Sequence, residues 1–222
     1  MANSSLATYR KISSKSNART GKITKITIHH MSGKMTGKEC ADYFATTDRE
    51  VSANYCVGYD GDIAVSVDEE RRAWTSSSRE NDYAAVTIEV SNDGGAPDWH
   101  VSDKALAATI KLCADVCKRN GIKKLYYDGT TSATLTRHCM FANTDCPGPY
   151  LKSKTPYICD EVNKLINASS TTTTTPSTST STTTNKTLWR VQVGAYSVKK
   201  NAENMRDKLK AAGFTAIIVE GK

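Results

Sequence analysis

The sequence has little that would suit a membrane-spanning or fibrous protein. Its 222 residues contain no apolar run that approaches the roughly 18–20 residues needed to cross a bilayer. There are five prolines and 13 glycines, which excludes collagen-like and proline-rich chains. Hydrophobic residues make up 38 %, too many for a chain that is disordered throughout. We therefore expect a globular protein without membrane insertion.

The N-terminal residues also lack the features of a secretion signal. The first ten, MANSSLATYR, contain no apolar core. This predicts a soluble protein that is made in the cytoplasm and reaches any substrate outside the cell by a separate route.

Acidic residues are in the minority, and the imbalance lies at one end of the chain. Residues 1–168 carry 22 basic and 20 acidic groups, whereas residues 169–222 carry 8 and 3. The excess positive charge of the tail fits attraction to a polyanion such as nucleic acid, a membrane surface or an anionic cell wall. The charge alone does not choose among these.

Seven cysteines are present, at positions 40, 56, 113, 117, 139, 146 and 159. An odd number without a secretion signal argues against a disulfide framework. We expect most of them to be small buried residues, with one available as a metal ligand.

The clearest boundary is a segment rich in Ser and Thr, residues 169–187, in which sixteen of nineteen residues are one or the other. It cannot bury enough apolar surface to offset the entropy of ordering, so it predicts a flexible linker. The chain then divides into a domain at 1–168, the linker at 169–187 and a small module at 188–222.

Strand and helix signals alternate along the first domain. Four segments have strand character: Ile23–Ile28, Asn54–Val57, Ile63–Val67 and Val86–Val90. The second and third flank an Asp-Gly turn and predict a hairpin. One helix is predicted from the cap Ser102 to the stop Gly121, and a last one from Pro156 to Asn167. Together they predict an α/β fold, a mixed central β-sheet with flanking helices.

The small module has the pattern of a β-α-β unit. Strands are predicted at 189–193 and 214–219, around a helix at 197–212. A unit of about 35 residues is marginally stable alone. We therefore expect something to complete it.

Two strands with one apolar face each carry a charged or ionisable residue on the opposite face. Alternation sets His29 opposite Ile28, and Glu89 opposite Ile88. Either residue alone would ordinarily be a half-exposed surface position, and that alternative stays open here. The adjacent His30 is expected to be a packed residue rather than a ligand.

A further pair, His138 and Cys146, is separated by seven residues of a loop that contains Pro and Gly. Imidazole and thiolate both bind zinc, and a third ligand from His29 would leave one tetrahedral position open, as catalytic zinc sites do. A buried cysteine and a surface histidine would give the same pattern, so the pair alone is weak evidence.

These motifs together resemble the zinc-dependent N-acetylmuramoyl-L-alanine amidases related to peptidoglycan recognition proteins, a family that includes phage endolysins and bacterial autolysins. The resemblance covers roughly residues 20–165 and rests on ITIHHMS (26–32), SANYCVGYDG (52–61), VTIEV (86–90), and His138 with TDCPG (144–148). It implies Zn2+ held by His29, His138 and Cys146.

The resemblance also implies a zinc-hydroxide mechanism that cleaves the amide bond between N-acetylmuramic acid and L-alanine. Glu89 would carry the proton from the attacking water to the leaving amine, and the Thr144 hydroxyl would help to stabilise the oxyanion. Candidate substrate contacts are Trp74, Asn81 and Tyr55.

The tail resembles the first half of the SPOR repeat, a peptidoglycan-binding module, through WRVQVGAYS (189–197) and KAAGF (210–214). Because the usual form has two such halves, the resemblance predicts that two chains pair their tails into a homodimer.

The leading hypothesis is a phage or prophage endolysin, held in the host cytoplasm until release and acting at the cell wall. A bacterial autolysin of the same activity is the nearest alternative. A non-catalytic peptidoglycan-binding protein is disfavoured because Cys146 is present. A nucleic-acid binder is disfavoured because the basic tail lacks interleaved aromatic residues.

Overall fold

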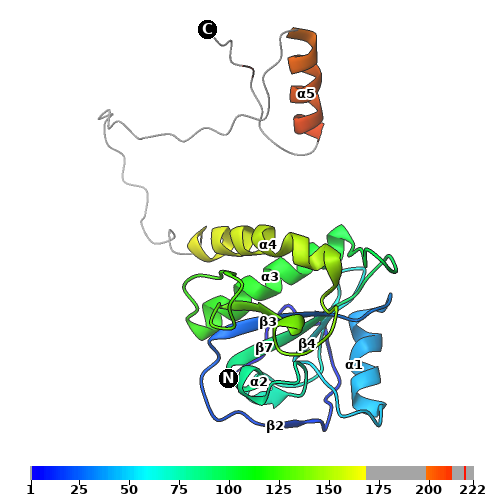
Figure 1. Ribbon diagram of the computed structural model, residues 1–222, viewed down its shortest axis with the longest axis vertical. Helices are drawn as coiled ribbons and strands as arrows, with labels where there is room; N and C mark the ends of the chain where they lie inside the picture. Colours follow the sequence, from blue (N-terminus) through cyan, green and yellow to red (C-terminus); the bar gives the residue numbers. More distant parts are fainter. Residues whose placement is uncertain (1, 169–198, 212–217, 219–222) are drawn as a thin grey trace, which may run out of the picture. The chain divides into compact units, whose positions relative to one another are not determined.

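The structure of the protein is a computed structural model that describes residues 2–168, 199–211 and 218 (Figure 1). The chain divides into two compact units, Met1–Thr173 and Thr174–Lys222. In the second unit, helix α5 (Lys199–Ala211) confirms the predicted helix. The predicted linker, the flanking strands and their pairing between two chains lie outside the described residues, apart from Ile218. None of the described helices is long and apolar enough to span a membrane.

The first unit is built on a mixed sheet, as predicted, and this sheet has six strands. Its order is β1 (Tyr9–Arg10), β5 (Ile63–Val65), β4 (Tyr55–Val57), β7 (Ala85–Val90), β3 (Lys25–His30) and β8 (Leu135–Arg137). Within this sheet of the described residues, β4 and β5 are the one antiparallel pair, which confirms the predicted hairpin. The short strands β2 (Ser16–Ala18) and β6 (Arg71–Ala73) pair separately.

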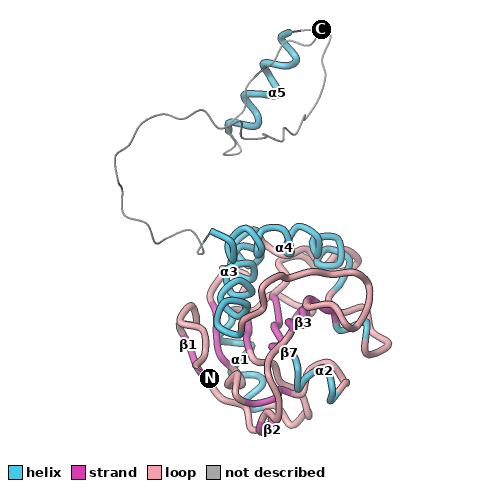
Figure 2. The backbone as a smooth tube through the Cα atoms, turned by 90° about the vertical axis from the view of Figure 1, so that its left-hand side faces the viewer, coloured by secondary structure: helices cyan, strands magenta, loops and turns pink. Residues whose placement is uncertain are grey.

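Helices cover both faces of the sheet (Figure 1 and Figure 2). The long helices α3 (Asp103–Asn120) and α4 (Gly148–Ala168) pack on one face, where the larger hydrophobic core lies. Helix α1 (Gly37–Thr46) packs on the other face through a smaller core, and α2 (Arg79–Ala84) precedes β7. A single 3-10 turn, His138–Met140, follows β8.

The two residues predicted to begin and end α3, Ser102 and Gly121, act as predicted. The Ser102 hydroxyl accepts a hydrogen bond from the Ala105 N–H at 3.1 Å, which satisfies one free donor of the first turn. Gly121 ends the helix in the left-handed conformation, with φ of 71°, where glycine is favoured.

The predicted start of α4 was wrong. The helix begins at Gly148, so Pro156 lies inside it rather than at its first position. Because proline has no N–H, the carbonyl of Lys152 loses its helical donor. The Arg137 guanidinium supplies the missing hydrogen bond to this carbonyl at 2.8 Å, so the helix continues through the proline.

The alternative that His29 is a half-exposed surface residue on β3 is wrong. Strands β3 and β7 are parallel neighbours in the middle of the sheet, where both faces are covered. His29 is therefore completely buried, and the Glu89 side chain is only 14 % exposed.

Candidate metal centre

Three parallel strands bring the predicted site residues to one edge of the sheet. His29 pairs in register with Glu89 across β3 and β7. On the other side of β3, Ile28 pairs with Arg137 of β8, so His138 comes immediately after, at the level of His29. Since parallel strands end at the same edge, residues far apart in the sequence meet there.

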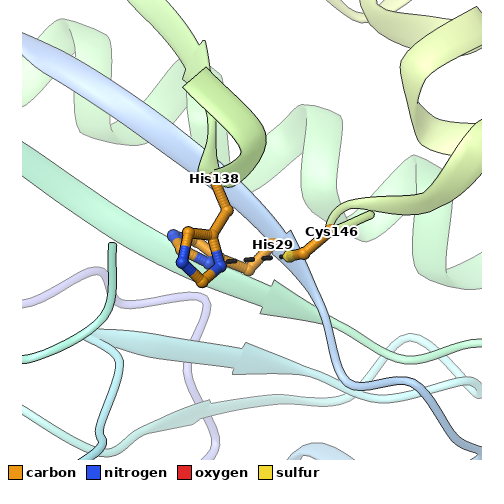
Figure 3. A group of neighbouring side chains, drawn as sticks. All are labelled: His29, His138 and Cys146. Carbon is orange, nitrogen blue, oxygen red and sulfur yellow. Dashed lines mark hydrogen bonds between the residues drawn. The ribbon is translucent and has the colours of Figure 1, made fainter. Parts of the chain in front are cut away.

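The side chains of His29, His138 and Cys146 point toward one another (Figure 3), with donor atoms that all lie within 4.8 Å. His29 Nδ1 is 3.7 Å from Cys146 Sγ, and the two imidazole centroids are 4.6 Å apart. Two imidazoles and a thiol in this arrangement can hold a metal ion.

Burial keeps these donors uncharged. It lowers the pKa of His29 well below 6.5, helped by the neighbouring His138, and it also lowers the pKa of His138. Both imidazoles are therefore neutral at pH 7, with a free nitrogen lone pair available to a metal. Burial raises the pKa of the Cys146 thiol, so its ionisation calls for a nearby cation.

Glu89 lies beside this group. Its Oε1 is 3.9 Å from His29 Nδ1, and burial raises its pKa to about 8. A carboxyl group with a pKa close to neutrality can both accept and release a proton at the working pH of an enzyme.

Several buried atoms of the site have no hydrogen-bond partner among the described residues. They are His29 Nε2, His138 Nε2 and Glu89 Oε2. Unpartnered buried polar atoms are uncommon in folded proteins. An ion, water or substrate at this site would supply the missing partners.

The loop that carries Cys146 is held by short contacts. The Cys139 N–H donates to the Cys146 carbonyl at 3.0 Å. The Cys146 N–H donates to the Thr144 hydroxyl at 3.2 Å. The structure thus places Thr144 against the backbone of Cys146, where it orients the loop; a role in oxyanion stabilisation stays a prediction.

Of the three predicted substrate contacts, only Trp74 has a partly exposed side chain. Its indole N–H donates to Asn17 Oδ1 at 2.7 Å, and the Arg72 guanidinium lies 5.9 Å from its ring. Trp74 remains available to a ligand at the surface.

Tyr55 and Asn81 do not have the exposed side chains that a substrate contact needs. Tyr55 is fully buried and pairs with Ile88, so it points to the sheet face opposite Glu89, where its hydroxyl donates to Glu69 at 2.5 Å. Asn81 is 3 % exposed, and its amide donates to Thr27 Oγ1 at 2.9 Å.

Sequence reasoning missed a buried polar layer under the site. Thr27 and Thr136 lie two residues before His29 and His138, on the same sheet face, and their hydroxyls are 2.9 Å apart. Asn81 completes this layer from α2. The alternation of β3 that singled out His29 also assigned Thr27 to its face, and that was the available signal.

Comparisons with known proteins support this picture. The family model described as N-acetylmuramoyl-L-alanine amidase matches residues 19–149, more than half of the chain. The SPOR domain model matches residues 161–222, a span that starts inside α4, ahead of the predicted start at 188. A search among curated proteins finds no match.

Similar solved structures share the fold of the first unit. PlyL has 18 % identity and a TM-score of 0.56, covering 69 % of this chain and 95 % of its own. The PlyG catalytic domain has 18 % identity and a TM-score of 0.58, covering 75 % and 98 %. Staphylococcus aureus AmiA, solved with its ligand, has 14 % identity and a TM-score of 0.58, covering 73 % and 84 %.

Proposed function

The chain belongs to the N-acetylmuramoyl-L-alanine amidase family, and we propose that it acts on peptidoglycan through a zinc ion held by His29, His138 and Cys146. The observation that carries the proposal is the convergence of these three donors beside Glu89 at one edge of the sheet. The substrate bond is the amide between N-acetylmuramic acid and L-alanine.

The donor set fits zinc. Imidazole nitrogen and thiolate sulfur are its usual protein ligands, at about 2.0–2.3 Å, which sets tetrahedral donors about 3.5 Å apart. The 3.7 Å between His29 Nδ1 and Cys146 Sγ is close to that spacing, and the three donor atoms all lie within 4.8 Å of one another. Three protein ligands leave a fourth position open, and bound zinc would there polarise the substrate carbonyl and lower the pKa of water.

Glu89 carries the proton in this proposal. Its carboxylate accepts a proton from the attacking water, and the carboxylic acid then delivers it to the leaving nitrogen of L-alanine. The unpartnered Oε2 is available for both steps. Burial alone raises the pKa of Glu89 to about 8, and a bound zinc ion would lower it toward the carboxylate form that accepts the proton. The Thr144 hydroxyl, half-buried beside Cys146, is the nearest candidate for an oxyanion contact.

The test uses the full chain, purified cell walls, and the same reaction with a chelator. Newly exposed L-alanine amino groups are expected, whereas new reducing sugars would indicate a glycosidase. Cys146→Ser and His138→Ala should abolish release, and Glu89→Gln should lower kcat by roughly 10²–10⁴-fold. Cys139→Ser, a neighbouring cysteine outside the donor set, is the matched control and should keep wild-type activity. Wild-type rates in His138→Ala or Glu89→Gln would refute the assigned roles.

We also propose that the tail retains the enzyme at the cell wall. The match of the SPOR model to residues 161–222 supports this, as does the basic charge of the tail. Binding of the full chain to intact walls should be compared with binding to glycan stripped of its peptides. Sedimentation of the full chain would test the predicted homodimer, and a concentration-independent monomer would rule it out.

As a biological setting we propose an endolysin of phage or prophage origin that stays in the bacterial cytoplasm until release and acts at the wall. One similar fold is described as a mutant endolysin from Bacillus subtilis, with 19 % identity and a TM-score of 0.53. A bacterial autolysin is the alternative, and a neighbouring gene for a membrane-hole protein would favour the endolysin.

A further inference from the structure

His30 is a buried histidine that the proposed chemistry does not use. It follows the ligand His29 on β3 and points to the opposite face of the sheet, with 7 % of its surface exposed. Its Nε2 lies 3.1 Å from the Ser32 hydroxyl. The packed position expected from the sequence is confirmed, but the neighbours of the ring give it a more specific role.

The ring of His30 is enclosed by Trp99 and Gly148. The Trp99 indole meets it edge-on, with centroids 5.3 Å apart. Gly148 lies so close that a Cβ there would come within 3.0 Å of Trp99 Cβ and 3.2 Å of His30 Cε1 and Nδ1. Gly148 also has φ of 81°, a conformation that other residues rarely adopt. The backbone at Gly148 therefore runs next to the imidazole and leaves no room for a side chain between them.

This contact lies two residues after Cys146, and a second contact reaches the thiol itself. The backbone N–H of His30 donates to Cys146 Sγ at 3.4 Å. His30 therefore meets the Cys146 turn twice, through its main chain at the sulfur and through its ring at Gly148.

The other side of the enclosure is anchored to the sheet and to α4. The Asn92 amide, just past β7, donates to the Trp99 carbonyl at 2.7 Å. The Tyr150 N–H in the first turn of α4 donates to the Asp98 carbonyl at 3.2 Å. Trp99 is held in the left-handed conformation, with φ of 54°, which is costly for a non-glycine residue and is maintained by these contacts.

We propose that His30 is a positioning residue. Its ring, enclosed by Trp99 and Gly148, holds the Cys146 thiol at the distance from His29 that two ligands of one metal ion require. The inference rests on the proposed role of Cys146 as a metal ligand. Partners that orient the ligands of a metal are commonly worth 10–100-fold in affinity. His30 would act by packing against the Cys146 turn from the face of β3 opposite to His29.

The experiment titrates Co2+ alone into the metal-free full chain. The thiolate-to-cobalt absorption band reports the bond to Cys146, and its growth gives the affinity. His30→Ala should weaken Co2+ binding 10–100-fold and lower the band intensity per bound ion. Gly148→Ala should do the same, because its added Cβ pushes His30 and Trp99 away. His30→Gln should recover part of the loss, since its amide can reach the Ser32 hydroxyl.

Leu112→Ala is the matched control, because Leu112 on α3 is fully buried in the larger hydrophobic core, away from the His30 ring. It should lower resistance to urea and leave the cobalt band at the wild-type intensity. The proposal is overturned if His30→Ala and Gly148→Ala keep the wild-type affinity and band, or if Leu112→Ala changes them equally. Cys146→Ser separates the two hypotheses: if it keeps the wild-type band, the proposed ligand set fails, whatever His30 does.

Discussion

Replacing Glu89 by glutamine should stabilise the metal-free protein at neutral and alkaline pH. Burial raises the pKa of Glu89 from 4.5 to about 8 in the folded chain, whereas the unfolded chain has the ordinary value. Between these values the folded state binds more protons than the unfolded state. The free energy of unfolding contributed by this group therefore falls as pH rises through that window.

The magnitude follows from the two pKa values. The change from 4.5 to about 8 corresponds to roughly 5 kcal/mol, at about 1.4 kcal/mol for each tenfold change in proton affinity. Most of it, about 3–4 kcal/mol, is lost between pH 5 and pH 8. Because the side chain is 14 % exposed, water reaches its edge, and the measured loss should lie at or below this value.

The assay is urea unfolding of the wild type and Glu89→Gln in the presence of a chelator, at pH 5, 6.5 and 8. The stability advantage of Glu89→Gln should grow with pH, and saturating Zn2+ should shrink it because a dication favours the carboxylate. Glu80→Gln, which makes the same change at an exposed position, should follow the wild type throughout. Parallel curves for the wild type and Glu89→Gln from pH 5 to pH 8 would refute the reasoning.

Three further predictions concern metal removal, a buried ion pair and a helix cap. At free Zn2+ 1,000-fold above Kd, binding should add about 4 kcal/mol. Chelation should then lower the Tm measured by calorimetry by about 8–16 °C. A Tm that stays the same with and without zinc would contradict the proposed zinc site. Arg119 donates to both carboxylate oxygens of the fully buried Glu69, at 2.9 and 2.6 Å. Arg119→Met should therefore lower the urea-unfolding free energy by about 3–5 kcal/mol, with partial recovery in Arg119→Met/Glu69→Gln; a loss below 1 kcal/mol would show that the pair is dispensable. Ser102→Ala should lower the free energy of unfolding in urea by about 1 kcal/mol. An unchanged free energy would mean that the Ser102 hydroxyl does not cap α3.

Much of the local structure could be predicted because its signals are local. The alternation at residues 23–28 and 86–90 predicted β3 and β7, and the turn at 60–61 predicted the hairpin of β4 and β5. Ser102 and Gly121 bound α3 through contacts with its own end turns. Each of these features depends on residues a few positions apart, so nearby residues in the sequence are enough to predict it.

The features that were missed depend on partners distant in the chain. The sequence pattern predicts a helix start at Pro156, because a missing N–H is harmless there, but Arg137 supplies the hydrogen bond that lets α4 continue through the proline. Tyr55 was expected to contact substrate, but its place in the register turns it to the opposite face of the sheet from Glu89.

The sequence by itself determined the donor types: two imidazoles, a thiol and a carboxyl group on segments whose motifs identify the family. Only the tertiary structure decided that they meet, since parallel pairing in the sheet brings His29, Glu89 and His138 to one edge. It also decided their chemical state, because burial by distant helices and loops shifts the pKa of each donor. The position of Cys146 depends on His30, more than a hundred residues away in the chain, through contacts that no local pattern records.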